Sequence, residues 1–301
     1  MKNIVKIPLI IAGVLIGLGV IIIAVGFAVG GTSWLFGSSK MEDKTVEIKD
    51  SFDSIKVETD SIDVRFAPAQ DGNCRVEAHL SDTMSFTAEV KNNTLTISCK
   101  DRRHWYQFIN FHSFDGKMTV YLPEGAYSSL KLTSASGNIQ ISDCASFGFV
   151  DITTASGDVA ASANGIESLS VSTASGDVLY DSQKSSATIQ LNTASGDIEL
   201  KNVSCKNLKI HSVSGEVSLS RTVCSDKLAI NTTSGDVDLS ACDAEEITVN
   251  SVSGDVSGSL LSDKVFSAHS VSGDVRVPQD GNGGKCAIKT TSGDISIRIS
   301  G

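Results

Sequence analysis

Apolar and polar residues alternate through most of the second half of the chain, in a unit that recurs every 19 or 20 residues. Each unit contains Ser-Gly followed by Asp, Glu or Asn, with mostly apolar residues seven and five positions before the glycine and two and four after it. Alternation with a period of two predicts a strand on each side of a polar turn. The glycines of these corners are Gly137, Gly157, Gly176, Gly196, Gly215, Gly235, Gly254, Gly273 and Gly293.

Strands this short cannot bury their inner faces within one unit, so neighbouring units are expected to stack with equivalent residues in register. The predicted fold is all-β: a single-stranded parallel β-solenoid of about nine regular coils over residues 130–301.

The polar corner has a structural explanation that requires no activity. Glycine tolerates positive φ, Asp can accept hydrogen bonds from nearby backbone amides, and the Ser and Thr hydroxyls supply further partners.

Stacking would also place the acidic side chains one coil apart, where neighbouring carboxylates repel by roughly 1 kcal/mol. A turn hydrogen bond offsets about that much. Calcium bridging is the alternative, because hard cations prefer oxygen ligands. Its candidate ligands are Asp158, Asp177, Asp197, Asp236, Asp255, Asp274 and Asp294.

A β-rich region at residues 46–129 precedes the regular coils. Alternating stretches such as residues 62–66 and 95–99 predict strands, and Asn92-Asn93 predicts a hairpin turn. We expect these strands to continue or cap the solenoid rather than to form a separate catalytic domain.

An aromatic-rich insertion at residues 101–117 interrupts this alternation. Either it covers an open part of the core, or it contacts a lipid surface or a partner protein with the help of two arginines. Its candidate contact residues are Arg102, Arg103, Trp105, Tyr106, Phe108, Phe111 and Phe114.

The first part of the chain predicts a membrane anchor. Residues 7–39 carry no charged side chain, and residues 9–29 are almost wholly Ile, Leu, Val, Ala and Gly. A helix of that length is roughly 31 Å long, which matches the hydrocarbon core of a bilayer. We predict a transmembrane helix at residues 7–31, between a tail at 1–6 and a linker at 32–45. A cleaved signal peptide is the alternative, but the apolar region of a signal peptide is usually shorter. Lys2 and Lys6 indicate a cytoplasmic amino terminus, so the protein is expected to be single-pass with its C-terminal domain extracytoplasmic.

The sequence ends directly after Ile295, Ile297 and Ile299, with no capping helix. We therefore expect an uncapped last coil that offers free backbone donors and acceptors. The predicted partners are the lipid bilayer, through the anchor helix, and either a second copy or a membrane protein at the open coil.

Composition and motifs argue against several functions. The 25 Lys+Arg against 35 Asp+Glu give a net charge of −10, which excludes a basic nucleic-acid binder. No nucleophile elbow, phosphate loop or HExxH motif is present, so we predict no catalytic residue and no cofactor. The enzyme alternative is a β-helix lyase or hydrolase of carbohydrates that uses the acidic column. The near uniformity of the repeat counts against it, because active sites are local departures from a repeat.

The seven cysteines have an odd number, which leaves at least one unpaired. Cys205 and Cys224 each lie nine residues after a repeat glycine and are therefore predicted to stack. We expect buried free thiols, with a Cys205–Cys224 or Cys74–Cys99 disulfide as the alternative. The cysteines are Cys74, Cys99, Cys144, Cys205, Cys224, Cys242 and Cys286.

The stretch Val-Tyr-Leu-Pro-Glu-Gly at residues 120–125, followed by tandem Ser-Gly-Asp-Val or Ser-Gly-Asp-Ile units behind one predicted anchor helix, resembles the bacterial toastrack family. This family comprises β-strand-repeat proteins regarded as adhesins, including LiaG-like proteins, and its molecular function is largely undefined. The resemblance covers roughly residues 46–301. It implies a bacterial cell-membrane protein of an envelope-stress module that also contains LiaI, LiaF and PspC-type proteins. We expect a non-catalytic scaffold, sensor or adhesin-like contact module; an adhesin for glycans or host surfaces is the alternative.

Overall fold

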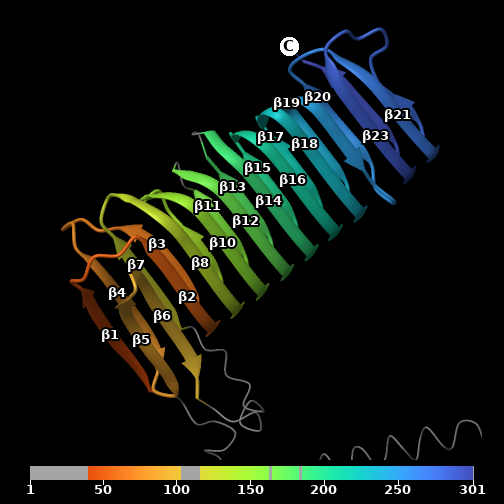
Figure 1. The fold of residues 1–301 in the computed structure, drawn as a ribbon. Helices are drawn as coiled ribbons and strands as arrows, with labels where there is room; N and C mark the ends of the chain where they lie inside the picture. The colour runs from red at the N-terminus through yellow and green to blue at the C-terminus, as the bar shows by residue number, and fades with distance from the viewer. Residues whose placement is uncertain (1–39, 103–115, 163–164, 183–184, 301) are drawn as a thin grey trace, which may run out of the picture.

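The computed structural model describes residues 40–102, 116–162, 165–182 and 185–300, which form a rod of stacked β-coils (Figure 1). Each regular coil contains a long strand, a corner at the repeat glycine, a short strand and a return loop. Equivalent strands pair in parallel and in register, as Leu169 with Ile189 and Val178 with Ile198 show. The predicted all-β solenoid is confirmed, and the described residues contain no helix.

The long strands form one face of the rod, the long-strand sheet, and the short strands form the other, the short-strand sheet. Strand β19 (Val237–Asn250) begins in the short-strand sheet and ends in the long-strand sheet. In order along the rod, the other long-strand members are β5 (Met84–Lys91), β6 (Thr94–Asp101), β2 (Ser54–Ser61), β8 (Ala126–Ser136), β10 (Ser146–Ser156), β12 (Ile166–Ser175), β14 (Ser185–Ser195), β16 (Ser204–Ser214), β18 (Val223–Ser234), β23 (Gly284–Ser292) and β21 (Lys264–Ser272). The other short-strand members are β1 (Met41–Ile48), β4 (Cys74–Ser81), β7 (Lys117–Leu122), β3 (Asp63–Pro68), β9 (Ile139–Ile141), β11 (Val159–Ser162), β13 (Val178–Asp181), β15 (Ile198–Lys201), β17 (Val217–Ser220), β20 (Val256–Leu260), β24 (Ile295–Ile299) and β22 (Val275–Arg276).

The inward-facing side chains of the two sheets form one continuous core. Leu191 and Ile210 from the long strands and Leu200 and Leu219 from the short strands are fully buried. Burial of one such side chain stabilises the fold by about 1.5–3 kcal/mol. Because each coil presents equivalent apolar residues, this packing holds successive coils together.

The corner glycine is required by backbone geometry. Gly196 has a φ of +145°, and a Cβ at this position would collide with the carbonyl oxygen of Gly176 in the preceding coil. A side chain is therefore excluded both by conformation and by the close approach of two backbones.

Two coils of the N-terminal β region belong to the same stack although they lack the Ser-Gly-Asp corner. In the coil of β2 and β3, Ile62 stands at the glycine position, and both strands pair in register with β8 and β9. In the coil of β6 and β7, the chain leaves the ladder at Arg102 and returns at Gly116, beside Ile62. The aromatic insertion thus stands at the corner of a solenoid coil.

Antiparallel strands cap the N-terminal end of the rod. Strand β4 pairs with β7, β1 pairs with β4, and β5 pairs with β6. Asn92 and Asn93 adopt φ values of 50° and 62° between β5 and β6, which confirms the predicted hairpin turn. The N-terminal β region therefore both continues and caps the solenoid.

The coils at both ends are stacked in an order that differs from the sequence. The coil of β2 and β3 lies between those of β6–β7 and β8–β9. At the other end, β23 lies between β19 and β21 (Figure 1). In the short-strand sheet, β24 lies between β20 and β22. The prediction that Ile295, Ile297 and Ile299 form an open last coil is therefore wrong. The end coil is β21–β22, because the glycine-rich loop at residues 277–283 packs directly against Asp263 and Lys264 and leads the chain back inward.

The predicted anchor at residues 7–31, the tail at 1–6 and most of the linker lie outside the described residues. Within the described part of the chain, no helix has the length and apolar character needed to cross a membrane.

Replacement of Gly196 with Ala is expected to lower the free energy of unfolding by more than about 2 kcal/mol, because the new methyl group meets the Gly176 carbonyl and the backbone becomes strained. Gly125→Ala is the matched control, since the nearest atom to its Cβ would be the Pro123 carbonyl oxygen at 3.9 Å. Chemical denaturation compares the two variants. Equal stabilities would contradict the requirement for glycine at the corner.

Candidate interaction surfaces

The residues that follow the corners form an exposed, mostly acidic column along the rod. Its members are joined by hydrogen bonds between coils: the Asp177 amide donates to Asp158 Oδ1 at 2.9 Å, and the Asp197 amide donates to Asp177 Oδ1 at 2.8 Å. Asn138 accepts from the Asp158 amide in the same way at 3.0 Å. Along the rod the column contains Asp63, Asn138, Asp158, Asp177, Asp197, Glu216, Asp236, Asp255, Asp294 and Asp274.

These bonds explain why Asp is the common residue in the column. The sequence predicted that each Asp bonds amides near its own turn, whereas the structure shows bonds to the next coil. In most coils one side-chain oxygen thereby accepts a hydrogen bond from a backbone amide of the neighbouring coil, which contributes about 1 kcal/mol and offsets repulsion along the column.

The column borders a groove of about 490 Å³ on the short-strand sheet, beside β11, β13 and β15. Among the described residues, no group of three or more His, Cys, Asp or Glu side chains is arranged to hold a metal ion. Calcium bridging by Asp158, Asp177 and the other candidates stays a hypothesis. The hydrogen bonds between coils give the column a structural role that involves no metal.

Asp177→Asn is expected to leave the free energy of unfolding within about 0.5 kcal/mol of the wild type, because an Asn oxygen already fills this role at position 138. Asp177→Ala removes the acceptor for the Asp197 amide and is expected to cost about 1 kcal/mol. Thermal melts with and without calcium measure both effects. A calcium-dependent rise in Tm that Asp177→Asn reduces would show that the column binds calcium.

The seven cysteines are buried free thiols. The Sγ atoms of Cys205 and Cys224 lie 3.2 Å apart on paired positions of β16 and β18, which confirms the predicted stacking. Burial raises the pKa of Cys74 and of Cys242 to about 12. The hydrogen bond with Cys205 and burial both raise the pKa of Cys224. These thiols are therefore protonated near neutral pH and are poor nucleophiles.

The stability of the fold is expected to decrease as the pH rises above 9. In the unfolded chain a thiol loses its proton near the ordinary pKa of 9.0, whereas folded Cys242 holds its proton up to about 12. Between these values the unfolded state binds fewer protons, so alkali favours unfolding; below 9 the two states bind equally.

Cys242→Ala removes one of these groups. Urea denaturation at about pH 8 and about pH 10.5 should show a smaller loss of stability for this variant than for the wild type. Parallel losses in the two proteins would contradict the contribution of this thiol.

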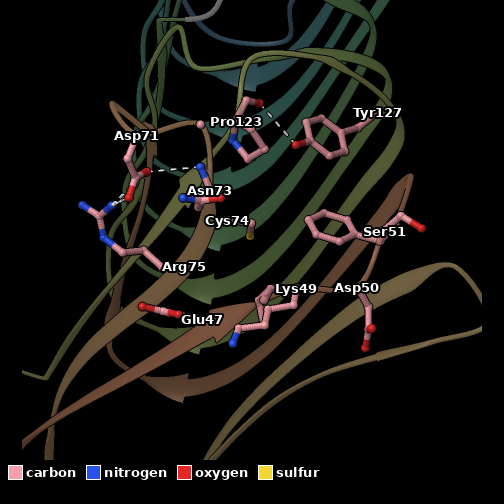
Figure 2. A pocket seen from close by; sticks show the side chains of 13 residues that line it. Glu47, Lys49, Asp50, Ser51, Asp71, Asn73, Cys74, Arg75, Pro123 and Tyr127 are labelled. Carbon is pink, nitrogen blue, oxygen red and sulfur yellow. Dashed lines mark hydrogen bonds and ion pairs between the residues drawn. The ribbon is translucent and has the colours of Figure 1, made fainter.

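A cleft of about 640 Å³ opens at the N-terminal end of the rod, where the connections after β1, β3 and β7 meet (Figure 2). The buried side chains of Cys74 and Tyr127 lie in its floor. The Tyr127 ring stacks between Phe52 and Phe147, with centroids 5.6 and 5.8 Å away, and its hydroxyl donates to the Pro123 carbonyl at 3.3 Å. The floor of the cleft is therefore aromatic.

The rim of the cleft is charged. Arg75 Nε donates to Glu77 Oε1 at 2.9 Å, Arg75 Nη1 lies 3.3 Å from Asp71 Oδ2, and the guanidinium lies 4.0 Å from the centre of the Tyr121 ring. The bond to Glu77 raises the pKa of Arg75, and the Asn73 backbone amide lowers the pKa of Asp71. Both groups therefore stay ionised near neutral pH.

Burial raises the pKa of Tyr127 to about 12, so the floor beneath this rim is neutral. The cleft suits a ligand that presents an apolar face to the aromatic floor and polar substituents to the charged rim. The sequence did not predict it, because its residues come from three separate loops that the interleaved order of the N-terminal coils brings together.

The two ends of the rod differ in the edge strands they expose. At the N-terminal end, β1 carries Glu42, Asp43 and Glu47, and charged edge strands resist pairing with other chains. At the other end, β21 carries no acidic residue and is paired only with β23 among the described strands.

The core is open at this second end. Val275 is 40% exposed, whereas its equivalents Val237 and Val256 are fully buried. Phe266 is only partly buried, and Val265 and Val271 on the outer side of β21 are 51% and 68% exposed. We call residues 264–277 the open end.

Of the predicted contact residues of the insertion, only Arg102 is described; Arg103, Trp105, Tyr106, Phe108, Phe111 and Phe114 lie outside the described residues. The Arg102 amide donates to the Thr83 carbonyl at 3.1 Å, and the Asp82 amide donates to the Lys40 carbonyl at 2.9 Å. The linker and the insertion therefore both leave the domain at the turn between β4 and β5.

Comparison with known proteins agrees with this architecture. Residues 52–267 match the model of the Toastrack DUF4097 family. The chain belongs to this family. The resemblance seen in the sequence is thereby confirmed, and the repeated corners with their stacked glycines are those of a toastrack protein.

Solved structures of similar fold come from Bacteroides and Parabacteroides species. A proposed adhesin of Bacteroides fragilis is 16% identical, with 87% of this chain and 98% of that chain covered and a TM-score of 0.50. A proposed adhesin of Parabacteroides distasonis is also 16% identical, with 86% and 98% covered and a TM-score of 0.51. At this identity the likeness shows the toastrack fold alone. No curated protein matches the sequence significantly.

Proposed function

We propose that this toastrack protein is a non-catalytic contact module of the bacterial cell envelope, which is anchored in the membrane near its capped end and binds another protein at its open end. The observation that carries this proposal is the contrast between the ends: charged, antiparallel caps at one end and, at the other, an acid-free edge strand with two exposed valines.

The open end has the features of a surface that accepts an additional strand. Strand β21 offers nine residues of backbone with one side of the ladder unfilled among the described strands. A strand from another chain would satisfy these backbone groups and cover the partly exposed Phe266 and Val275. Backbone hydrogen bonds would supply affinity, and the alternating side chains would supply specificity.

The capped end fits an attachment to the membrane. Lys40 is held at the turn between β4 and β5, so the predicted anchor helix would leave the rod there. The aromatic insertion begins beside the same turn, at Arg102, and this proximity to the proposed anchor supports lipid contact by its aromatic residues and arginines. The open end lies at the opposite end of the rod from the proposed anchor, where a scaffold or sensor for envelope stress would meet its partner.

The acidic column supports the non-catalytic part of the proposal. Its Asp oxygens are engaged by backbone amides of the next coil, as Asp177 is by Asp197. A carbohydrate-active enzyme would require carboxylates placed for proton transfer rather than for stacking.

A glycan-binding adhesin is the second candidate function, and the cleft over Phe52 and Tyr127 favours it. Sugar rings present apolar faces that stack on aromatic side chains and hydroxyls that bond to charged groups. The rim groups Asp71 and Arg75 are positioned to form such bonds.

Photo-crosslinking in living bacteria tests the proposed function. A photoreactive amino acid at Val271 is expected to give a covalent adduct with another protein chain, because this side chain lies at the open end. The same amino acid at Lys209, exposed in the middle of the rod, is the control and should give at most a tenth of that yield. Equal yields at the two positions would contradict the open end as the contact surface.

A further inference from the structure

We propose that the chain bound at the open end is a second copy of this protein, joined by antiparallel pairing of β21 with β21 of that copy about a two-fold axis at Ala268. This inference rests on the proposed role of the open end and names its partner.

The register follows from the length of the strand. Strand β21 runs from Lys264 to Ser272, so its centre is Ala268. Only an axis at this residue pairs the whole strand with its copy and leaves no unpaired overhang. A two-fold axis also makes each contact occur twice, which gives a self-complementary interface.

This register also brings the most exposed apolar side chains of the strand together. Val265 and Val271 are three residues before and three after Ala268, so Val265 lies opposite Val271 of the second copy, and the reverse. Their exposed fractions of 51% and 68% would both fall. Cross-strand apolar pairs of this kind stabilise an antiparallel ladder.

The inward face is compatible with the same register. Phe266 lies opposite Ser270 of the second copy, so a large side chain meets a small one, and Ala268 lies opposite its own equivalent. The cores of the two rods would then meet across the axis. Phe266, which is only partly buried in the single chain, would become an interior residue.

Charge favours this pairing over other contacts between copies. The chain has a net charge of −10, yet β21 contains no Asp or Glu, so the two edges meet without opposed carboxylates. The edge strands at the capped end carry Glu42, Asp43 and Glu89, and pairing these strands with β21 in a head-to-tail filament would take their charges out of water. Pro278, which has no amide hydrogen, limits pairing by the neighbouring short strand. The expected product is a closed pair of rods.

Disulfide trapping tests the register. Full-length V265C and V271C, mixed in detergent under mild oxidation, are expected to form an intermolecular disulfide between the two variants. Neither variant alone should form it, because identical positions lie at opposite ends of the paired strand. The native thiols are buried and serve as an internal background. Trapping by each variant alone, at the same yield as by the mixture, would overturn the two-fold register.

A charge-swap series tests the energetics by sedimentation of the full-length protein. V265E/V271E places like charges opposite each other and is expected to raise the dissociation constant of the pair at least about tenfold. V265K/V271E places opposite charges across the axis and should restore pairing close to the wild-type value. Weakening by both variants alike would contradict the proposed contacts, because loss of the valines alone would then explain it.

The two proposals can fail separately. If the photoreactive group at Val271 captures only a different protein and the wild type sediments as a monomer, self-pairing is wrong while the contact function of the open end holds. If Val271 captures nothing above the Lys209 control, both proposals fail.

Discussion

The close approach of backbone to backbone at the glycine corners is the constraint on which the rest of the structure depends. The corner peptide of one coil lies against the Cα of the next, so that a Cβ at Gly196 would collide with the carbonyl oxygen of Gly176. Glycine at the corner permits the close spacing that parallel pairing of successive coils requires. With the register set, apolar residues stack on apolar residues, and an Asp such as Asp177 reaches the amide of the following coil. Core packing and the acidic column are thus consequences of one steric rule.

Much of the fold could be predicted because the requirement for glycine at each corner is visible in the repeat. Glycine at a fixed spacing, flanked by alternating apolar residues, indicates a turn between strands, and the shortness of the strands indicates stacking. Two coils of the N-terminal β region, which was expected to continue or cap the solenoid, are absent from the predicted regular repeats because their corners differ: Ile62 replaces the glycine in one, and the chain of the other is interrupted by the insertion. At these positions only the in-register pairing of the flanking strands reveals the coil.

The candidate surfaces were harder to predict from the sequence. Local chemistry indicated that Asp would bond backbone amides, but the identity of the amide depends on a neighbouring coil. The cleft over Tyr127 depends on three loops, and the open end depends on which coil is outermost. Nothing in the alternation of residues 284–299 distinguishes an interior coil from a terminal one, because both need the same inward-facing residues. The glycine-rich stretch at residues 277–283 was the available signal for a return of the chain.

The interleaved end of the rod has a consequence for how the protein assembles. Strands β21 and β22 precede β23 and β24 in the chain but dock onto them. During synthesis, β21 and β22 therefore cannot form their native pairing until β23 and β24 have emerged and paired with β19 and β20. Simple addition of one coil after another in sequence order therefore cannot produce the native arrangement at this end. The edge of β21 therefore takes up its native position only after residues 284–299 have been synthesised.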